Sequence, residues 1–350
     1  MQPTRSQPPN TPTSGARPQD PRGPKGTQSP RKRDGQRQLV LTQGDPEGIG
    51  PELLLRLGDA GLLNASDRIF ADPRVLKQLC ETLGKAWARR GWAAIEPLLA
   101  ADLPSPMTQV QALARAVDHI INVDDPSLVA LVTAPIDKAR CNAEGFAFPG
   151  HTEYLADRAG VDEVAMLMVG PRLRVVPATI HIPLRAVPDA LTPKRIISAG
   201  RLLALALHRD FGIAAPTIGV LGVNPHAGER GLLGSEERTV ITPAIKALQA
   251  WAVESGAPIT FAGPLPADTA FPQHASGRYD GLVAMYHDQG LGPFKLLHMH
   301  DGVNMTLGLP FVRTSPDHGT ARDIAGQGIA DPSSMFAATS LARGQASFAL

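Results

Sequence analysis

The chain has 350 residues, and its 34 Lys and Arg residues nearly balance its 33 Asp and Glu residues. No stretch approaches the roughly 18 uninterrupted apolar residues of a membrane helix, and no apolar segment of a secretory signal follows the N-terminus. Cys80 and Cys141 are too few for a disulfide framework and lack the spacing of a zinc ribbon, so we expect a reducing, cytoplasmic setting.

The first segment of the chain differs in composition from the rest. Residues 1–38 contain eight Pro, eight Lys or Arg and two acidic residues, a net charge of +6, whereas 26 basic and 31 acidic residues follow. So little apolar surface cannot offset the entropy lost on ordering, and we expect residues 1–37 to form a disordered, basic tail. One alternative makes the body a non-catalytic ligand-binding protein and this tail the functional part, attached to nucleic acid or an acidic surface.

Short apolar runs alternate with longer amphipathic runs through the body, which is typical of an α/β protein with a largely parallel sheet. The predicted strands 164–169 and 173–179 are separated by only three residues, which include Gly170 and Pro171. This short connection indicates a hairpin and hence a mixed sheet. The predicted strands are 39–42, 128–132, 164–169, 173–179, 217–223, 258–261, 281–285 and 303–307, and the predicted helices include 110–123, 193–208 and 236–253.

Three predicted strands are each followed by a histidine. These residues are His181, His226 and His287. In open α/β sheets, ligands collect beyond the carboxyl ends of strands, and three neutral imidazoles suit a divalent metal with open positions for substrate. The pattern therefore predicts a metal site, whose charge an anionic substrate could balance. A metal-dependent hydrolase or phosphatase is an alternative, although the clustered carboxylates of two-metal phosphatases are missing from the sequence.

Two further segments suggest binding of an anion. His151 and Thr152 precede an amphipathic stretch, and Lys295 and Arg313 lie in an apolar setting around the predicted strand that contains Asn304. Cations in such a setting need an anion from the protein or a ligand. The loop 44–52 lacks the glycine spacing of a dinucleotide fingerprint, and it could bind phosphate or serve as a helix start capped by Asp45.

Several motifs in order give the chain a family resemblance over about residues 38–345. The motifs are 44–52, 150–153, 223–229, 266–269, 286–290 and 302–322. Together they resemble the 4-hydroxythreonine-4-phosphate dehydrogenase family of pyridoxal 5′-phosphate biosynthesis. The stretch 317–332 also resembles the isocitrate and isopropylmalate dehydrogenases, which implies a two-lobed α/β fold with largely parallel mixed sheets and helices on both faces.

The resemblance implies how the chain is divided and assembled. Residues 38–150 with about 305–350 would form the first lobe. Residues from about 151 to 304 would form the second lobe, with the metal site and the dimer interface. The active site would be shared across the interface of a homodimer, without nucleic acid or membrane as partner.

The resemblance also implies roles for single residues. His181, His226 and His287 would bind one divalent metal (zinc, magnesium or cobalt), one of them contributed by the partner subunit. The implied substrate contacts are His151, Thr152, Lys295, Asn304 and Arg313. NAD or NADP would bind near 317–332. The general base is open, and Asp268, in a short loop after an apolar run, is a candidate.

The implied reaction is oxidation of 4-phosphohydroxy-L-threonine at its 3-hydroxyl, followed by loss of CO₂ to give 3-amino-2-oxopropyl phosphate. Sister branches of the family oxidise phosphothreonate, phosphoerythronate or aromatic cis-dihydrodiols. The segment 291–301 departs from the residues expected in many members, and it borders Lys295. Substrate preference could therefore differ at this position.

Overall fold

The computed structural model describes residues 36–344. The predicted tail and residues 345–350 thus lie outside the described residues, apart from Gln36 and Arg37. Arg37 is buried, and its guanidinium lies 2.9 Å from the carboxylate of Asp210, so it belongs to the folded body.

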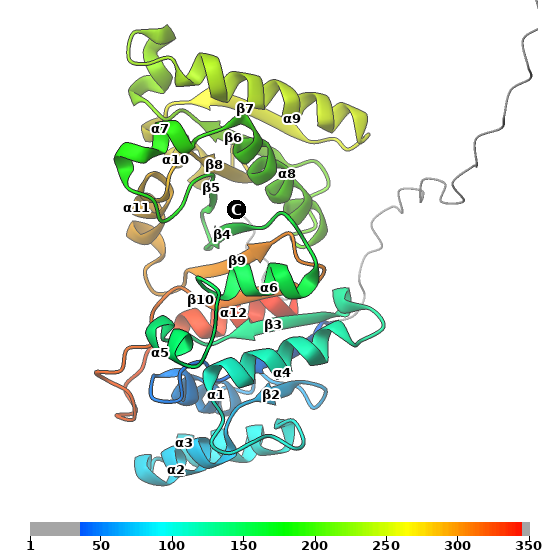
Figure 1. Ribbon diagram of the computed structural model, residues 1–350, viewed down its shortest axis with the longest axis vertical. Coiled ribbons are helices and arrows are strands. Elements are labelled where there is room, and N and C mark those ends of the chain that lie inside the picture. Colours follow the sequence, from blue (N-terminus) through cyan, green and yellow to red (C-terminus); the bar gives the residue numbers. More distant parts are fainter. Residues whose placement is uncertain (1–35, 345–350) are drawn as a thin grey trace, which may run out of the picture. The chain divides into compact units, whose positions relative to one another are not determined.

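Within residues 36–344, ten strands form one sheet in the order β2-β1-β3-β10-β9-β4-β5-β8-β6-β7 (Figure 1). The strands are β1 (Gln38–Thr42), β2 (Arg68–Phe70), β3 (Val129–Thr133), β4 (Ala165–Val169), β5 (Arg174–Pro177), β6 (Thr217–Leu221), β7 (Thr260–Leu265), β8 (Gly281–Ala284), β9 (Val303–Leu307) and β10 (Val312–Pro316). The helices are α1 (Gly50–Asp59), α2 (Pro73–Leu83), α3 (Ala86–Ile95), α4 (Gln109–Ile121), α5 (Lys138–Ala143), α6 (His151–Ala159), α7 (Val187–Ala190), α8 (Pro193–Arg209), α9 (Thr242–Glu254), α10 (Ala267–Ala275), α11 (His287–His298) and α12 (Ser333–Arg343).

The strand pairings confirm a mixed, largely parallel sheet. At one end of the sheet, β2, β1, β3 and β10 pair in parallel. At the other end, β5, β8, β6 and β7 also pair in parallel. The antiparallel pairs β10–β9, β9–β4 and β4–β5 join these two parallel sets. The predicted hairpin is β4–β5, closed by a hydrogen bond from the backbone N–H of Gly170 to the carbonyl of Leu173 (2.9 Å).

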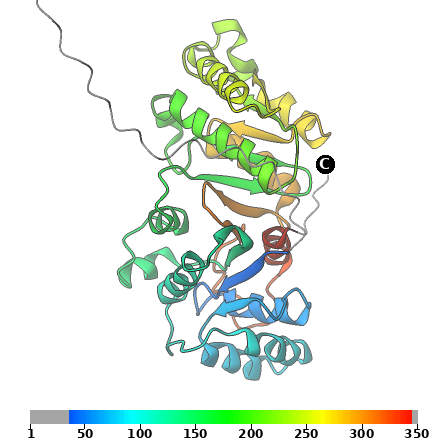
Figure 2. The same ribbon diagram turned by 90° about the vertical axis from the view of Figure 1, so that its right-hand side faces the viewer.

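Helices cover both faces of the sheet (Figure 2), which confirms the predicted fold class. Successive residues of a strand point to opposite faces. In β1, Leu39 and Leu41 pack in the cluster that contains α1 and α12 residues, whereas Val40 packs with residues of α4 and α6. In β5, Val176 packs on the α8 and α9 side, and Val175 packs with α10 and α11. The division into two lobes at residues 150 and 305 stays a prediction.

The structure differs from the predicted elements in several places. The three-residue strand β2 is too short to give a periodic signal. Strand β10 has the sequence Val-Arg-Thr-Ser-Pro, whose polar residues and proline argue against a buried strand, yet every residue in it is buried. The predicted helix 236–253 begins as a π-helical turn at Glu237–Ile241 before α9.

Between residues 36 and 344, none of the helices has the length and apolar character needed to cross a membrane. Cys80 and Cys141 are both free and buried.

Candidate active site

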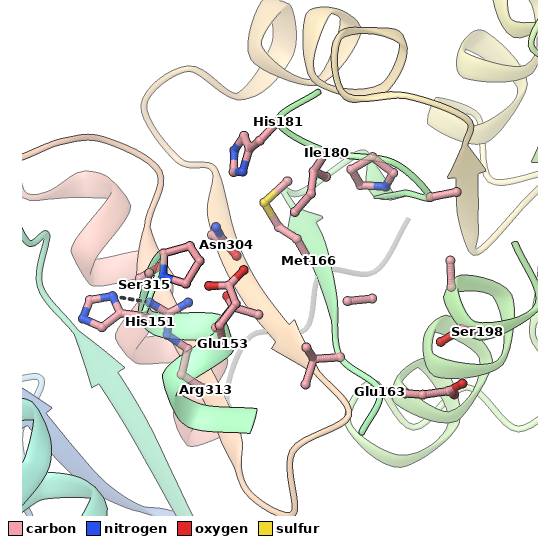
Figure 3. A pocket seen from close by; sticks show the side chains of 18 of the residues that line it. His151, Glu153, Glu163, Met166, Ile180, His181, Ser198, Asn304, Arg313 and Ser315 are labelled. Atoms are coloured by element: carbon pink, nitrogen blue, oxygen red, sulfur yellow. Dashed lines mark hydrogen bonds between the residues drawn. The ribbon is translucent and has the colours of Figure 1, made fainter. Parts of the chain in front are cut away.

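A cavity of about 1020 Å³ lies beside the central antiparallel strands. It is lined by the loop after β3, the starts of α6 and α8, the segment after β5, and parts of β9 and β10. Figure 3 shows His151, Glu153 and Arg313 on one wall, with Glu163 and Ser198 on another. Of the predicted site residues, this cavity brings together His151, Thr152, His181, Asn304 and Arg313, and it does not include His226, Asp268, His287 or Lys295.

Arg313 is a buried cation held by neutral groups. It lies in β10 with 3% of its surface exposed. Its Nη1 donates to Oγ1 of Thr306 (3.1 Å), and its Nη2 donates to Oγ1 of Thr133 (2.7 Å). Burial lowers the pKa of Arg313 to about 10, while the charge of Glu153 raises it. The guanidinium is therefore charged at neutral pH, and within residues 36–344 no carboxylate comes within 4.0 Å of it.

His151 begins helix α6 and contacts this cation. Its Nδ1 lies 3.1 Å from Nη2 of Arg313. Burial, followed by the charges of Arg313 and Lys138, holds the pKa of His151 well below its ordinary value. The imidazole is thus neutral at neutral pH. Thr152 follows in the first turn of α6 and also lines the cavity.

Three polar atoms around Arg313 are buried without a hydrogen-bond partner among the described residues. They are Nε2 of His151, Oδ1 of Asn304 and Nε of Arg313 itself. Burying a polar atom without a hydrogen bond costs about 1–3 kcal/mol, and an uncompensated buried charge costs more. A bound anion with further polar groups would complete this wall of the cavity.

Lys295 lies outside this cavity. Its Nζ is 2.7 Å from Oδ2 of Asp317 and donates to the backbone carbonyl of the same residue at 3.1 Å. Lys295 therefore anchors the start of the 317–332 stretch and already has a counter-charge.

Glu52 of α1 fastens the far end of this stretch. The side chain is fully buried, and its two carboxylate oxygens accept from the backbone N–H groups of Gly328 (3.1 Å) and Ala330 (3.2 Å). Arg56 donates to the carbonyl of Gly328 (2.9 Å) and lies 3.3 Å from Glu52. Although it has no helix or strand, the stretch is held in one place.

The middle of the stretch is fastened by an ion-pair network. The Nε of Arg322 lies 2.7 Å from Oδ2 of Asp45, and its Nη1 lies 3.2 Å from Oδ2 of Asp137. The Nη1 of Arg140 lies 3.2 Å from the other oxygen of Asp45. Asp45 is fully buried, and it does not cap α1, whose N-cap residue Ile49 makes no side-chain cap bond. The loop 44–52 therefore fastens the stretch.

The three predicted metal ligands follow neighbouring strands. His181 follows β5, His287 follows β8 and His226 follows β6, and these strands are adjacent and parallel in the order β5-β8-β6. Hydrogen bonds join their ends. Oγ1 of Thr179 donates to the carbonyl of Met285 (2.7 Å), and Nε2 of Gln289 donates to the carbonyl of Gly222 (2.7 Å).

His181 and His287 lie close together, with ring centroids 5.7 Å apart. A metal–nitrogen bond of about 2.1 Å places the metal about 3.2 Å from a ring centroid, so one ion could contact both rings. Nδ1 of His287 lies 2.7 Å from Oδ1 of Asp288, which leaves Nε2 for a metal. Nowhere in residues 36–344 do three His, Cys, Asp or Glu side chains gather closely enough for a metal ion, so His226 does not join this pair within one chain.

Asp268 lies at a different site from the main cavity. It is in the first turn of α10, and its Oδ1 accepts from the backbone N–H of Thr269 (2.9 Å). It lines a second cavity of about 550 Å³, together with Phe271 and the exposed side chains of Leu296 and Leu297. Its role as a base stays a prediction.

The sequence did not point to the residues that hold the predicted site residues in place. Thr133 and Thr306 hold the guanidinium of Arg313, and Glu237 contacts the loop of His226 from more than ten residues away. Thr133 directly follows a predicted strand, which is a signal that could have singled it out. Nothing in the sequence shows the contacts of Glu237.

Comparison with known proteins identifies the family. The family model described as pyridoxal phosphate biosynthetic protein PdxA matches residues 101–342. The chain belongs to the PdxA family. It is 44% identical over 328 residues to 4-hydroxythreonine-4-phosphate dehydrogenase of Paracoccus denitrificans, covering 87% of this chain and 97% of that protein. The resemblance found in the sequence is therefore confirmed, as is the prediction of an oxidoreductase of this PdxA family.

Solved structures agree with this assignment. The crystal structure of 4-hydroxythreonine-4-phosphate dehydrogenase from Klebsiella pneumoniae is 34% identical, with a TM-score of 0.74, and covers 89% of this chain and 98% of that chain. A terephthalate 1,2-cis-dihydrodiol dehydrogenase from Burkholderia xenovorans is 27% identical, with a TM-score of 0.59, and covers 88% of this chain and 98% of that chain. Proteins with different named substrates thus share this PdxA fold.

Proposed function

We propose that the chain oxidises 4-phosphohydroxy-L-threonine at its 3-hydroxyl with NAD or NADP, and that the product loses CO₂ to give 3-amino-2-oxopropyl phosphate. We further propose a cytoplasmic homodimer with one divalent metal, such as zinc, magnesium or cobalt, at each active site. Membership of the PdxA family supports the reaction and its place in pyridoxal phosphate biosynthesis.

The buried, charged Arg313 is the observation that carries the proposal. Its partners are neutral, and it lines a cavity with His151, Thr152 and Asn304. A phosphate or carboxylate of the substrate would supply the missing anion, because a guanidinium forms strong charge-assisted hydrogen bonds with such groups and Nε of Arg313 has no partner among the described residues. Thr152 and Asn304 would then orient the substrate through a hydroxyl and an amide.

The residues of the chain fit the proposed cofactors. Imidazole groups suit a borderline divalent ion, and the pair His181 and His287 has the spacing that one ion needs. His226 would complete the set across the dimer. The cavity of about 1020 Å³ is at the upper end for small-molecule sites, so it has room for a substrate beside a nicotinamide near His318. When bound, the metal would supply a Lewis acid and the nicotinamide a hydride acceptor.

Lys295 and Asp268 lie outside the main cavity, so their proposed roles each require a change in the site. Lys295 would bind the substrate only after releasing Asp317, with which it is now paired. Asp268 would act as the base only if the dimer brings it to the substrate, since it lies outside the main cavity. The cofactor segment would be the fastened stretch 317–332.

A substrate panel tests the proposal. Purified protein with NAD⁺, NADP⁺ and Co²⁺ is given 4-phosphohydroxy-L-threonine, phosphothreonate, phosphoerythronate or an aromatic cis-dihydrodiol, and absorbance at the wavelength of reduced nicotinamide is followed. We expect the highest kcat/KM for the phosphorylated amino acid. Faster oxidation of the dihydrodiol would instead favour a sister activity of the kind named for the Burkholderia xenovorans protein. Phosphate release without nicotinamide would favour a hydrolase.

A further inference from the structure

The loop that carries His226 has a strained backbone. The five residues His226–Arg230 have positive φ angles between 42° and 76°, and only Gly228 among them is a glycine. The left-handed conformation costs non-glycine residues about 1–2 kcal/mol each. Such a run persists only where its surroundings hold it, and strain of this kind clusters at functional sites.

Glu237 holds the start of this loop. The residue is buried, with 6% of its surface exposed. Its Oε1 accepts from the backbone N–H groups of Val223 (2.9 Å) and Asn224 (2.8 Å), and its Oε2 accepts from Nδ2 of Asn224 (3.0 Å). Because hydrogen bonds to a charged group are the stronger ones, this carboxylate fixes the chain where it leaves β6.

The same carboxylate packs under the left-handed run itself. A Cβ atom on Gly228 would lie 2.5 Å from Oε2 of Glu237, and a Cβ atom on Gly222 would lie 3.1 Å from Oε1. Both glycines therefore leave space that the carboxylate fills. Glu237 thus contacts the loop before His226 and again two residues after it.

Glu237 is the first residue of the π-helical turn Glu237–Ile241. Turns of this kind are rare in helices and are frequent at functional sites. This turn leads directly into α9, which packs against β7 and α8. The rigid core therefore supports the carboxylate that supports the loop.

We propose that Glu237 is the positioning residue of the metal site, holding the 224–230 loop in the left-handed form that presents the imidazole of His226. This inference rests on the proposed function, because it takes His226 as a metal ligand. Groups that orient a metal ligand typically contribute about 10- to 100-fold to metal affinity. Glu237 would act through the backbone and not by touching the metal.

Titration of the metal-free, full-length protein with Co²⁺, followed by visible absorption, tests this inference. We expect Glu237→Ala to weaken Co²⁺ binding about 10- to 100-fold and to change the absorption band, because His226 no longer keeps its place. Glu237→Gln keeps one oxygen acceptor, so its loss of Co²⁺ affinity should be smaller than that of Glu237→Ala but at least threefold.

The neighbouring Glu236 offers a matched control. Its Oε2 accepts from Nδ2 of Asn224 (2.8 Å) and from the backbone N–H of Ser235 (2.9 Å), and no hydrogen bond of its side chain reaches the backbone of residues 223 and 224. We expect Glu236→Ala and Glu236→Gln to bind Co²⁺ within about twofold of the unchanged protein. Circular dichroism below the unfolding temperature verifies that each variant is folded.

His226→Ala separates this inference from the proposed function. If His226→Ala binds Co²⁺ as tightly as the unchanged protein, the proposed metal site is wrong. If His226→Ala loses Co²⁺ but a folded Glu237→Ala keeps full affinity, the positioning role alone is overturned. Should Glu237→Ala fail to fold, Glu237→Gln decides, and Co²⁺ affinity equal to that of Glu236→Gln overturns the role.

Discussion

Nη2 of Arg313 donates to Nδ1 of His151 across 3.1 Å, and this contact determines the protonation of the imidazole. A guanidinium has only donors, so Nδ1 must accept. The neutral ring, which the lowered pKa of His151 favours, therefore carries its proton on Nε2. His151 acts as a neutral donor beside a cation, and the pair forms a surface suited to a phosphate or carboxylate.

Replacing Arg313 with Lys tests the anion site. The variant keeps a charge but loses the fork that reaches Thr133, Thr306 and His151 together. Hydrogen bonds of a charged group contribute about 1.5–3 kcal/mol, so we expect KM for the phosphorylated substrate to rise about 10- to 100-fold. Steady-state kinetics measure this, and an unchanged KM would remove Arg313 from the substrate site.

Replacing Arg322 with Ala tests the fastening of the 317–332 stretch. The change removes the ion pairs to Asp45 and Asp137 and leaves the buried Asp45 with Arg140. We expect KM for the nicotinamide to rise several-fold while KM for the phosphorylated substrate changes little. Arg313→Lys should show the opposite pattern, so each variant controls for the other. Equal effects on both KM values would argue against a cofactor role for this stretch.

His274 makes the stability of the fold depend on pH. Nδ1 of its buried ring lies 2.6 Å from the carbonyl of Tyr279, and Nε2 accepts from the backbone N–H of Arg174 at 2.8 Å. A second ring proton would face that N–H group, and burial, the largest cause, lowers the pKa of His274 from 6.5 to about 4.

Below pH 6.5 the imidazole of His274 therefore binds a proton in the unfolded chain but stays neutral in the folded chain until about pH 4. The free energy of unfolding thus falls as the pH falls. We expect His274 to lower the free energy of unfolding by about 2 kcal/mol between pH 7 and pH 5. Urea unfolding at both values measures this loss. His274→Gln should show a weaker pH dependence of the free energy of unfolding than the unchanged protein. The same loss in His274→Gln would show that other groups cause it.

Replacing Arg230 with Gly tests the strain in the His226 loop. Arg230 has a φ of 58°, which glycine adopts freely. We expect the free energy of unfolding of the variant to rise by about 0.5–1 kcal/mol and its unfolding temperature to rise by about 1–2 °C. Lys246→Gly, inside α9, should lower stability by about 1 kcal/mol instead. A lower unfolding temperature for Arg230→Gly would contradict the strained geometry.

Much of the fold followed from the sequence because apolar periodicity reports burial. All eight predicted strands are present, seven of them with shifted ends, since each carries a run of apolar residues. Helix α11 was not predicted because Gly290, Gly292 and Pro293 interrupt its pattern. His298 ends this helix and is buried. Strand β10 was missed because tertiary contacts of Arg313 override its polar composition.

The candidate site was predictable only where topology decides it. The rule that ligands gather at the carboxyl ends of parallel strands led to His181, His226 and His287, and β5, β8 and β6 do lie side by side. The contacts that hold a site residue in place join residues far apart in the sequence, so the sequence does not show them. Examples are the ion pair of Lys295 with Asp317 and the hydrogen bond from the backbone N–H of Asn224 to Glu237.

The proposed dehydrogenase activity is tested by the appearance of reduced nicotinamide from 4-phosphohydroxy-L-threonine. Full-length protein, NAD⁺ or NADP⁺, Co²⁺ and this substrate are mixed, and the absorbance at 340 nm is followed with and without a chelator. We expect a rising trace that the chelator abolishes and added Co²⁺ restores. A flat trace from folded protein that binds Co²⁺, or a trace unaffected by the chelator, would contradict the proposed activity.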